Sequence, residues 1–375
     1  MSARELICFG EDWGRHPSTA QFLAQRLLGS FRVIWINSIG WRTPRPTRAD
    51  FRRALAKLRA ASAGVTCPHP DLAVYTPLVL PWYGSAAARG LNAALLARAV
   101  RRLARRHGFS DYTLMTTYPA TEGVFRRMPG VRRIYYCADE YTTFPGLRPA
   151  LVAELERRLM DTVDVVVATS RALQEAKSAR HPRVVYLPHA VDVEHFARAC
   201  DPATPVPADL AALPRPIVGF TGLIRDLVDV EILDTIARRR PDWSVVLIGR
   251  RNFDAAPLPR RPNLHYLGER PYAEIPGYLR GLDVCLMPYR RVPTATYMNP
   301  VKLREYLAAG KPIVSTPLPE VVQFGGLVEV AADGDEFVAR IARCLAEDPA
   351  LPARRMASVR DHTWASRAAE LAEVL

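Results

Sequence analysis

The sequence has few of the features of an exported or membrane-spanning protein. No apolar run reaches the roughly 20 residues that a spanning helix needs, and Met1 to Gly10 contains no hydrophobic signal-peptide core. The six cysteines are scattered singly, without metal-ligand spacing, and most lie in apolar runs where a thiol behaves as a small hydrophobe. These absences predict a reducing, cytoplasmic location.

Motifs of two large enzyme classes are also missing. No Gly-x-Gly-x-x-Gly follows any predicted strand, which argues against a dinucleotide-dependent oxidoreductase. No cluster of Asp, Glu and His with metal-ligand spacing is evident, so we expect neither a metal site nor a bound cofactor.

The excess of positive over negative charge is confined to the first half of the chain. Residues 1–200 contain 29 lysines and arginines against 16 acidic residues, a difference of +13, whereas residues 201–375 contain 22 of each. Such a field attracts anionic partners such as a membrane surface or a lipid phosphate. The alternative is that arginines decorate solvated helix faces, and the charge alone favours neither. No nucleic-acid recognition motif accompanies it, so nucleic acid is not an expected partner.

Short apolar runs alternate with longer amphipathic stretches, which is the pattern of β-α-β units with parallel strands. In the first half, strands are expected at residues 5–10, 31–37, 112–117, 133–138, 163–169 and 183–187. Helices are expected at residues 18–28, 86–106, 150–160 and 171–179. Ser18 is expected to cap the first of these helices.

A proline-rich segment, DPATPVPADLAALPRP at residues 201–216, predicts an interdomain linker because proline breaks helices and strands. Strands are then expected at residues 217–221, 244–249, 264–267, 284–287, 312–315 and 327–330, and helices at residues 228–239, 272–280, 301–309 and 335–346. The predicted fold is α/β, with two Rossmann-like domains whose parallel sheets face a central cleft. These domains are residues 1–200 and 217–360, and a last helix at 361–375 is expected to pack back on the first.

The most informative segment is YMNPVKLREYLAAGKPIVSTPLPE, Tyr297–Glu320. Pro300 starts a helix whose first turns carry Lys302 and Glu305 on one face, and Gly310 ends it in a left-handed cap. A helix N-terminus suits a diphosphate, and a bound anion explains a lysine where the helix dipole favours acids. Glu305 can accept hydrogen bonds from ribose hydroxyls. Taken alone, the pair is more typical of an ordinary surface helix.

This segment and several others resemble one known protein family. PVKLREYLAAGKPIVST closely resembles the donor-site helix of family 4 retaining glycosyltransferases of the GT-B fold, in the bacterial exopolysaccharide and cell-envelope branch. Residues 217–249 and 263–290 resemble successive units of that donor domain, and residues 184–196 resemble its hinge, with His189 in place of the usual asparagine and interpreted as structural. Residues 9–23 and 135–146 resemble acceptor-domain segments. The resemblance covers nearly the whole chain.

The resemblance implies a donor site for a nucleotide sugar, of the UDP or GDP type, in the second domain. Gly222 follows the strand at 217–221 and would let backbone N–H groups approach a phosphate without an intervening Cβ. The residues expected to bind the donor are Gly222, Arg225, Arg250, Arg251, Gly268, Arg270, Asn299, Pro300, Val301, Lys302 and Glu305.

The sequence departs from the family pattern in two places. Tyr297 stands where the family commonly has the first acid of a Glu-x7-Glu pair, so that only Glu305 remains. Leu223 and Val228–Asp229 stand where many relatives carry an arginine and a lysine. The diphosphate then depends on the other cations of the expected donor set.

Three residues of the first half are the catalytic candidates. Asp139 follows the strand at 133–138, and Asp12 and His16 lie in the loop after the first strand. A carboxylate or an imidazole there can orient an acceptor hydroxyl. Asp12 and His16 are slightly more typical of a capped loop, whereas Asp139 is favoured because strand carboxyl ends face the ligand side of a parallel sheet.

Two basic helices with apolar stripes, at residues 45–61 and 98–108, can lie against anionic lipid. A lipid-linked or polysaccharide acceptor would suit such a surface. The alternative is that both are the basic solvent faces of core helices.

The sequence thus predicts a retaining, metal-independent, hexosyl-type glycosyltransferase of envelope or exopolysaccharide biosynthesis. Its expected partners are a nucleotide-sugar donor and a glycan or lipid-linked acceptor, and its expected place is the cytoplasm or the inner face of the membrane. The family implies no fixed protein nucleophile, so that pre-placed cations stabilise the leaving diphosphate. Two alternatives stay open: a GT-B nucleotide-sugar epimerase, whose usual carboxylate and histidine set is not found, and a non-catalytic nucleotide-sugar-binding scaffold.

Overall fold

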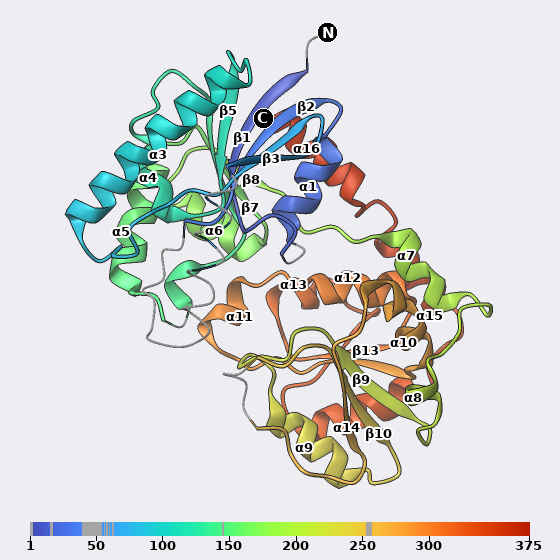
Figure 1. Ribbon diagram of the computed structural model, residues 1–375. Helices are drawn as coiled ribbons and strands as arrows, with labels where there is room; N and C mark the ends of the chain where they lie inside the picture. The colour runs from blue at the N-terminus through green and yellow to red at the C-terminus, as the bar shows by residue number, and fades with distance from the viewer. Residues whose placement is uncertain are drawn as a thin grey trace. The chain divides into compact units, whose positions relative to one another are not determined.

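The computed structural model describes residues 3–15, 18–39, 55, 57, 59, 61, 64–144, 146–252 and 257–375. The chain divides into two compact units, Met1–Pro188 with Trp364–Leu375, and His189–Thr363. Each unit is a sheet covered by helices, so the predicted α/β class with two largely parallel sheets is confirmed (Figure 1). His16 and most of the basic segment 45–61 lie outside the described residues.

The described part of unit 1 contains an eight-stranded sheet of order β3-β4-β2-β1-β5-β6-β7-β8. Its strands are β1 (Arg4–Phe9), β2 (Phe31–Ile36), β3 (Val65–His69), β4 (Leu72–Tyr75), β5 (Tyr112–Thr116), β6 (Arg133–Cys137), β7 (Val165–Ala168) and β8 (Val184–Tyr186). Neighbouring strands pair in parallel, except that the edge strand β3 runs antiparallel to β4.

Strands β3 and β4 are not predicted from the sequence. Strand β4 has only four residues, and β3 is mostly exposed and contains Pro68. Proline is tolerated at a sheet edge, where its missing N–H leaves no partner unsatisfied. Neither segment is long or regular enough to give a periodic signal, and their pairing with each other and with β2 makes them strands.

The helices of unit 1 follow the sequence pattern closely. They are α1 (Thr19–Leu27), α3 (Ala86–Arg106), α4 (Glu122–Phe125), α5 (Pro149–Met160), α6 (Arg171–Ser178) and α16 (Trp364–Val374), with short 3-10 turns η1 (Pro119–Thr121) and η2 (Tyr141–Thr143). Ser18 caps α1 as expected, its hydroxyl accepting a hydrogen bond from the N–H of Gln21. The last helix, α16, packs on α1, where the rings of Trp364 and Phe22 stack 4.8 Å apart.

Unit 2 has a six-stranded parallel sheet in the described residues, with the order β11-β10-β9-β12-β13-β14. Its strands are β9 (Ile217–Thr221), β10 (Ser244–Ile248), β11 (Leu264–Gly268), β12 (Val284–Met287), β13 (Ile313–Ser315) and β14 (Glu329–Val330). Every residue of β9, β10, β12 and β13 is buried, as expected of parallel strands covered on both faces. Counted along the chain this is the doubly wound order 3-2-1-4-5-6.

Helices cover both faces of this sheet. They are α7 (Val193–Ala197), α8 (Ala208–Ala211), α9 (Val230–Arg239), α10 (Ile275–Gly281), α11 (Pro293–Tyr297), α12 (Val301–Ala308), α13 (Pro319–Val322), α14 (Gly334–Cys344) and α15 (Leu351–Ser358), with η3 (Arg198–Cys200) and η4 (Tyr272–Glu274). Gly310 follows α12 with φ of +63°, which confirms the left-handed cap predicted there.

The segment 201–216, expected to be a linker, packs against α10 as a part of unit 2. It contains the short helix α8, and Leu210 is fully buried. A Cβ on Gly281 would lie 2.4 Å from Leu210 Cδ2, and a Cβ on Gly277 would lie 2.5 Å from the carbonyl oxygen of Pro205. Two glycines on one face of α10 therefore make room for this segment, and the chain passes between the units after Pro188 and after Thr363 instead.

Among the helices that the structure describes, none combines the length and the apolar character needed to span a bilayer.

His189 opens unit 2 as a buried, neutral side chain. Burial, together with the nearby positive charge of Arg304, lowers its pKa to about 3 from the ordinary 6.5. The protonated imidazole is therefore disfavoured in the folded state, which supports the structural interpretation of this residue.

Replacement of His189 by asparagine is expected to flatten the acid side of the stability profile. As the pH falls below about 6.5, the unfolded chain takes up a proton at His189 before the folded chain does, so the native state loses stability until the folded pKa is reached. The wild type should lose about 2 kcal/mol more than His189→Asn between about pH 7 and about pH 5. Urea titrations at each pH measure this, and parallel profiles for the two proteins would contradict it.

Candidate functional site

The carboxyl edge of the unit 2 sheet gathers most of the expected donor residues. In the doubly wound order, ligands bind beside the central strand pair where the chain reverses direction across the sheet, here β9 and β12. The loop after β9 begins at Gly222, and the chain after β12 leads through α11 to the first turn of α12 at Val301. Helix α12 thus begins at the point where the topology predicts a ligand.

Two glycines bring the loops of neighbouring strands into backbone contact. Gly222 and Gly249 have φ of +143° and +141°, a region that side-chain-bearing residues rarely adopt. A Cβ on Gly249 would lie 1.8 Å from the carbonyl oxygen of Gly222, so no side chain fits there. The N–H of Gly222 donates to Ile248 O at 2.8 Å, and that of Gly249 donates to Gly268 O at 2.8 Å. The loops after β9, β10 and β11 therefore form one continuous floor.

Lys302 lies across this floor. A Cβ on Gly222 would approach Lys302 Cε to 3.0 Å, so the lysine stem passes directly over the glycine. Its Nζ donates a 2.6 Å hydrogen bond to Glu305 Oε2, and the side-chain exposed fractions are 27% for Lys302 and 8% for Glu305. The predicted placement of both on one helix face is confirmed, and the ammonium retains two N–H donors for another acceptor.

Tyr306 fixes α12 against the end of β9. The ring is fully buried, its hydroxyl accepts from the N–H of Thr221 at 2.8 Å, and it donates to Thr221 O at 3.2 Å. This contact lies at the residue before Gly222. It therefore sets the height of the Lys302 side chain above the glycine floor.

Two tyrosines that the sequence analysis did not select lie beside Glu305. Burial and the Glu305 carboxylate raise the pKa of Tyr272 above its ordinary value. The same two causes raise the pKa of Tyr289, and the nearby Arg225 opposes them. Tyr272 is 47% exposed, and one face of its ring stacks on His195 at 4.3 Å. No periodic pattern in the sequence links these tyrosines to Glu305, so only the fold shows this proximity.

The expected arginines fall into different environments. Arg225 is half-buried in the loop after β9, and Arg250 and Arg251 are exposed after β10. The guanidinium of Arg270 is engaged by Asp209, at 2.6 Å, and by the hydroxyl of Tyr278, also at 2.6 Å. This engagement favours a structural role for Arg270, whereas the charge of Arg225 acts on Tyr289, whose pKa Glu305 also affects.

The remaining expected donor residues form the approach to α12 and the floor. Asn299 and Pro300 are buried, Pro300 is the residue before the first turn, and Val301 begins the helix. Asn299 accepts a hydrogen bond from the buried guanidinium of Arg304. Gly268, with φ of +80°, supplies the carbonyl oxygen that holds Gly249.

In unit 1 the loop after β1 is tied to its neighbours through Asp12. Its Oδ1 accepts from the hydroxyl of Ser38 at 2.7 Å, and its Oδ2 lies 3.3 Å from Arg15 Nη1. The N–H of Trp13 donates to Asn37 Oδ1 at 2.8 Å. The carboxylate of Asp12 thus joins the loops after β1 and β2, which favours the capped-loop interpretation.

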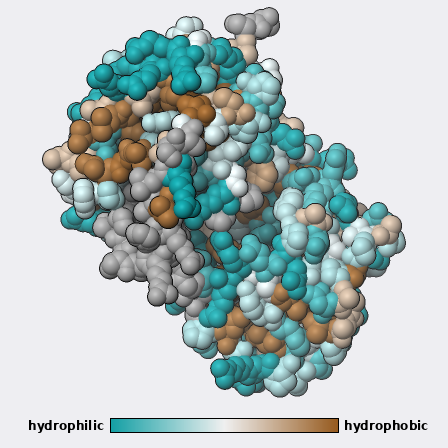
Figure 2. Space-filling model, in the orientation of Figure 1, coloured by the Kyte–Doolittle hydropathy of each residue, from teal (hydrophilic) through white to brown (hydrophobic). Residues whose placement is uncertain are grey.

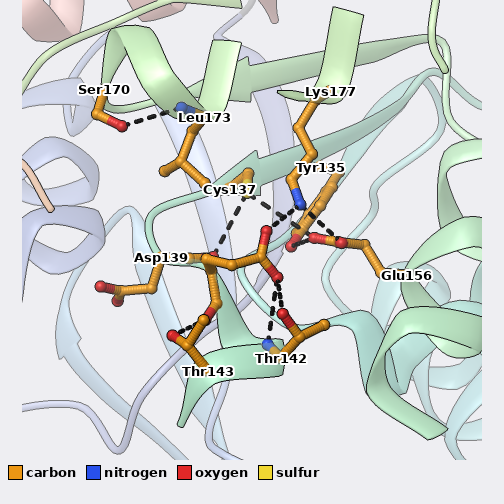
Figure 3. A network of polar contacts seen from close by, with 10 residues as sticks. Tyr135, Cys137, Asp139, Thr142, Thr143, Glu156, Ser170, Leu173 and Lys177 are labelled. Carbon is orange, nitrogen blue, oxygen red and sulfur yellow. Dashed lines mark hydrogen bonds and ion pairs between the residues drawn. The ribbon is translucent and has the colours of Figure 1, made fainter. Parts of the chain in front are cut away.

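Asp139 lies among aromatic rings at the carboxyl edge of β6. Burial raises the pKa of Tyr141, and the charge of Asp139 adds to this effect. For Tyr136, burial and the charge of Glu11 are the larger causes of a raised pKa, and Asp139 adds to them. Tyr136 is 1% exposed, and its hydroxyl has no hydrogen-bond partner among the described residues. The Asp139 carboxylate points away from the ammonium of Lys177 (Figure 3). Asp139 is predicted from the sequence, whereas Tyr136 and Tyr141 are not.

A buried ion triad anchors the loop that carries Asp139. Lys177 on α6 donates 2.7 Å hydrogen bonds to Glu140 Oε2 and to Glu156 Oε2, and all three side chains are at most 10% exposed (Figure 3). Glu156 on α5 also accepts from the hydroxyl of Tyr135 at 2.8 Å. Glu140 follows Asp139 directly, so α5, α6 and the loop after β6 meet at one ammonium group.

The triad also sets the charge of Glu140. Burial alone raises the pKa of this carboxyl, but the Lys177 ammonium and hydrogen bonds from Lys177 and Thr142 outweigh burial and hold the pKa below its ordinary value. The carboxylate therefore stabilises the fold above the pKa of the unfolded state, and this contribution is lost as the pH falls through the folded pKa.

The described residues contain no group of three or more His, Cys, Asp and Glu side chains that is placed to hold a metal ion.

Replacement of Lys177 by methionine is expected to lower the free energy of unfolding by about 3 kcal/mol or more at neutral pH. The change leaves two buried carboxylates without their cation. Without the ammonium, burial raises the pKa of Glu140, so the loss should shrink as the pH falls and this carboxyl takes up a proton. Urea titrations followed by circular dichroism at neutral and acidic pH measure both effects.

Arg157→Met is the matched control, because Arg157 pairs with the exposed Glu154 on the surface of α5. Its effect should be much smaller and should not vary with the protonation of the triad. Equal losses for the two variants would show that the triad does not anchor the loop.

Known proteins match both the sequence of unit 2 and the fold of the whole chain. Residues 215–347 match the family model described as "Glycosyl transferases group 1". The protein TuaH of Bacillus subtilis (strain 168), whose name assigns it to teichuronic acid biosynthesis as a glycosyltransferase, is 28% identical over 228 residues. That alignment covers 56% of this chain and 57% of the relative, so the chain spans little more than half the length of its curated relative.

Solved structures of similar fold cover nearly the whole chain. Sucrose-phosphate synthase from Thermosynechococcus elongatus aligns with a TM-score of 0.70 and 15% identity, over 99% of this chain and 98% of that chain. HepE of Anabaena, solved in complex with UDP and glucose, aligns with a TM-score of 0.68 and 14% identity, over 98% of both chains. At this level of identity the likeness to solved structures establishes the fold alone. Residues 215–347 are similar to the group 1 glycosyltransferases, and the chain has the GT-B fold, which together support a family 4 type glycosyltransferase.

Proposed function

We propose that the protein transfers a hexose from a nucleotide-sugar donor to a glycan or lipid-linked acceptor of the cell envelope or an exopolysaccharide, with retention of anomeric configuration. One observation carries this proposal: Lys302 and Glu305, on the first turns of α12, lie over the glycine floor at the switch point of the unit 2 sheet. A cation, a helix N-terminus and an adjacent buried carboxylate fit a diphosphate joined to a ribose.

In this proposal the donor binds with its diphosphate on the floor. The two spare N–H donors of Lys302 and the first N–H groups of α12 hold phosphate oxygens, and the absence of a Cβ at Gly222 allows a close approach. Glu305 then accepts hydrogen bonds from ribose hydroxyls. The UDP bound to HepE, which shares the fold, supports a uridine nucleotide as the first candidate.

The chemistry follows from charge that is already in place. As the glycosidic bond breaks, the leaving diphosphate gains negative charge, which Lys302, Arg225 and the positive end of α12 stabilise without moving. No protein nucleophile is needed, because a donor phosphate oxygen can take the proton of the acceptor hydroxyl. In this scheme the cations of the chain supply the positive charge at the diphosphate.

Asp139 is the proposed acceptor-side catalytic residue. Its loop is anchored by the Lys177 triad, and its carboxylate lies at the carboxyl edge of the unit 1 sheet. A fixed carboxylate there can orient the attacking hydroxyl. Asp12 and His16 stay predictions for the same role, although the contacts of Asp12 favour a structural one.

Replacement of Glu305 by alanine is expected to weaken UDP binding by about tenfold to a hundredfold, because hydrogen bonds from ribose to a charged acceptor are lost. Calorimetric titration with UDP, GDP, ADP and dTDP measures the affinities and identifies the preferred base. Asp242→Ala is the control, since Asp242 precedes β10 at the opposite edge of the same sheet. Unchanged affinity in Glu305→Ala would remove its ribose assignment.

Replacement of Asp139 by asparagine is expected to slow turnover by about a hundredfold or more while UDP affinity stays unchanged. With water as the acceptor, release of UDP from UDP-glucose gives the readout. Asp111→Asn is the matched control, because Asp111 is exposed and precedes β5 at the amino edge of the unit 1 sheet. Equal rates in the two variants would exclude Asp139 from the reaction.

Saturable UDP binding by the wild type, with no release of UDP from UDP-glucose and no transfer, would favour the binding-only alternative. That alternative is motivated by Tyr297, which stands in place of an acid near the donor helix.

A further inference from the structure

The outer face of α3 is apolar in its first half and basic in its second. Leu91, Leu95, Arg98, Arg102 and Arg105 follow one another at alternating spacings of four and three residues, which places them on one helix face. All five are exposed, and Leu91 and Leu95 have 50% and 51% of their surface in contact with solvent. Hydrophobic atoms gather over the first half of α3 and hydrophilic atoms over its second half (Figure 2).

The loop before α3 extends the apolar half. Leu78 and Trp82 are 58% and 60% exposed, the largest exposed fractions among the exposed large hydrophobic residues described. The buried side chain of Asn92 holds this loop against the helix, because it accepts from the N–H of Leu80 at 2.8 Å and donates to Leu80 O at 2.9 Å. Leu78 and Trp82, two residues on either side of Leu80, therefore lie on a loop fixed to α3. We call the exposed residues Leu78, Trp82, Leu91 and Leu95 the α3 patch.

The sequence around the α3 patch contains no acidic residue. Between Asp71 and Asp111 there is neither Asp nor Glu, whereas α3 itself carries six arginines. A helix on a solvated surface commonly alternates charges of both signs. An apolar patch beside a cluster of positively charged arginines instead complements a surface with an apolar interior and an anionic outer layer.

We propose that the α3 patch docks unit 1 on the surface of a membrane that contains anionic phospholipid. Trp82 and the exposed leucines enter the boundary between headgroups and acyl chains, which is the usual position of tryptophan and leucine in interfacial helices. Arg98, Arg102 and Arg105 bind lipid phosphates with their planar guanidinium groups. The long arginine side chains let their charges stay at headgroup level while the helix lies flat.

The chemistry favours a lipid surface over a protein partner. Arginine is the only charged residue type on the exposed face of α3, and a protein interface has its charges at the rim and depleted at the core. Here the charges continue along the same helix face as the leucines. A membrane surface can accommodate that arrangement. Its anionic headgroups lie directly above its apolar acyl chains, so a helix that lies flat meets both layers at every point along its length.

The position of the α3 patch bears on the acceptor. Strand β4 runs parallel to β2, and β2, β1, β5 and β6 run parallel to one another, so the loop with Leu78 and Trp82 leaves the same sheet edge as the loop with Asp139. If Asp139 orients the acceptor, which rests on the proposed function, a docked membrane presents lipid-linked acceptors at the edge where that residue lies.

Flotation of the full chain with lipid vesicles tests the proposal. The protein should bind vesicles of phosphatidylcholine mixed with phosphatidylglycerol and should not bind pure phosphatidylcholine. Leu91→Ser with Leu95→Ser should weaken partitioning by roughly tenfold or more, since two exposed leucines no longer bury apolar surface. Arg98→Gln with Arg102→Gln should weaken it by roughly tenfold and reduce its dependence on salt.

Matched controls lie in unit 2. Leu345→Ser removes another exposed leucine, and Arg354→Gln with Arg360→Gln removes two exposed arginines, and neither should change vesicle binding. UDP titration of every variant separates this test from that of the donor site, because the α3 changes should leave the affinity unaltered. Failure of the wild type to bind anionic vesicles, or equal losses in the α3 variants and the controls, would overturn the proposal.

Discussion

The proposed donor site depends on a close approach that only glycine allows. Gly249 meets the backbone of Gly222 with no room for a Cβ, and the stem of Lys302 passes over Gly222, where a Cβ would lie 3.0 Å from Lys302 Cε. Tyr306 holds α12 to Thr221, one residue earlier, and so fixes the height of that stem. The Gly222 backbone thus lies between the Gly249 backbone and the Lys302 side chain. This packing determines the position of Lys302 and its pairing with Glu305, and it leaves the N-terminus of α12 open.

Unit 1 positions Asp139, its catalytic candidate, by different means. Its carboxyl-edge loop is held by one buried ammonium shared between Glu140 and Glu156, rather than by glycine packing. Burying three charges is favourable only when they satisfy one another, so the geometry at Lys177 tolerates little displacement. Asp139 inherits that rigidity, because it is bonded directly to Glu140 in the chain.

The structure shows where part of the excess positive charge lies. A net charge of +13 says only that an anionic partner is attractive. On α3 the arginines share one exposed face with leucines, and Asn92 fastens Trp82 and its loop alongside. The same residues that look like a solvated basic helix in the sequence thus form a surface with an apolar end and a cationic end.

The sequence by itself determined the α/β class, nearly all long helices and buried strands, and the Lys302–Glu305 pair, because each rests on local periodicity or on spacing within one helix. It did not determine β3 and β4, which are strands only through their partners, nor the packing of residues 201–216 on α10. The Lys177 triad joins residues 37 and 21 positions apart in the chain, and no local pattern marks such a pair. The effect of the Glu305 carboxylate on the pKa of Tyr272 and of Tyr289 cannot be predicted from the sequence for the same reason. Contacts between distant segments depend on how strands and helices pack, so only the tertiary structure decided them.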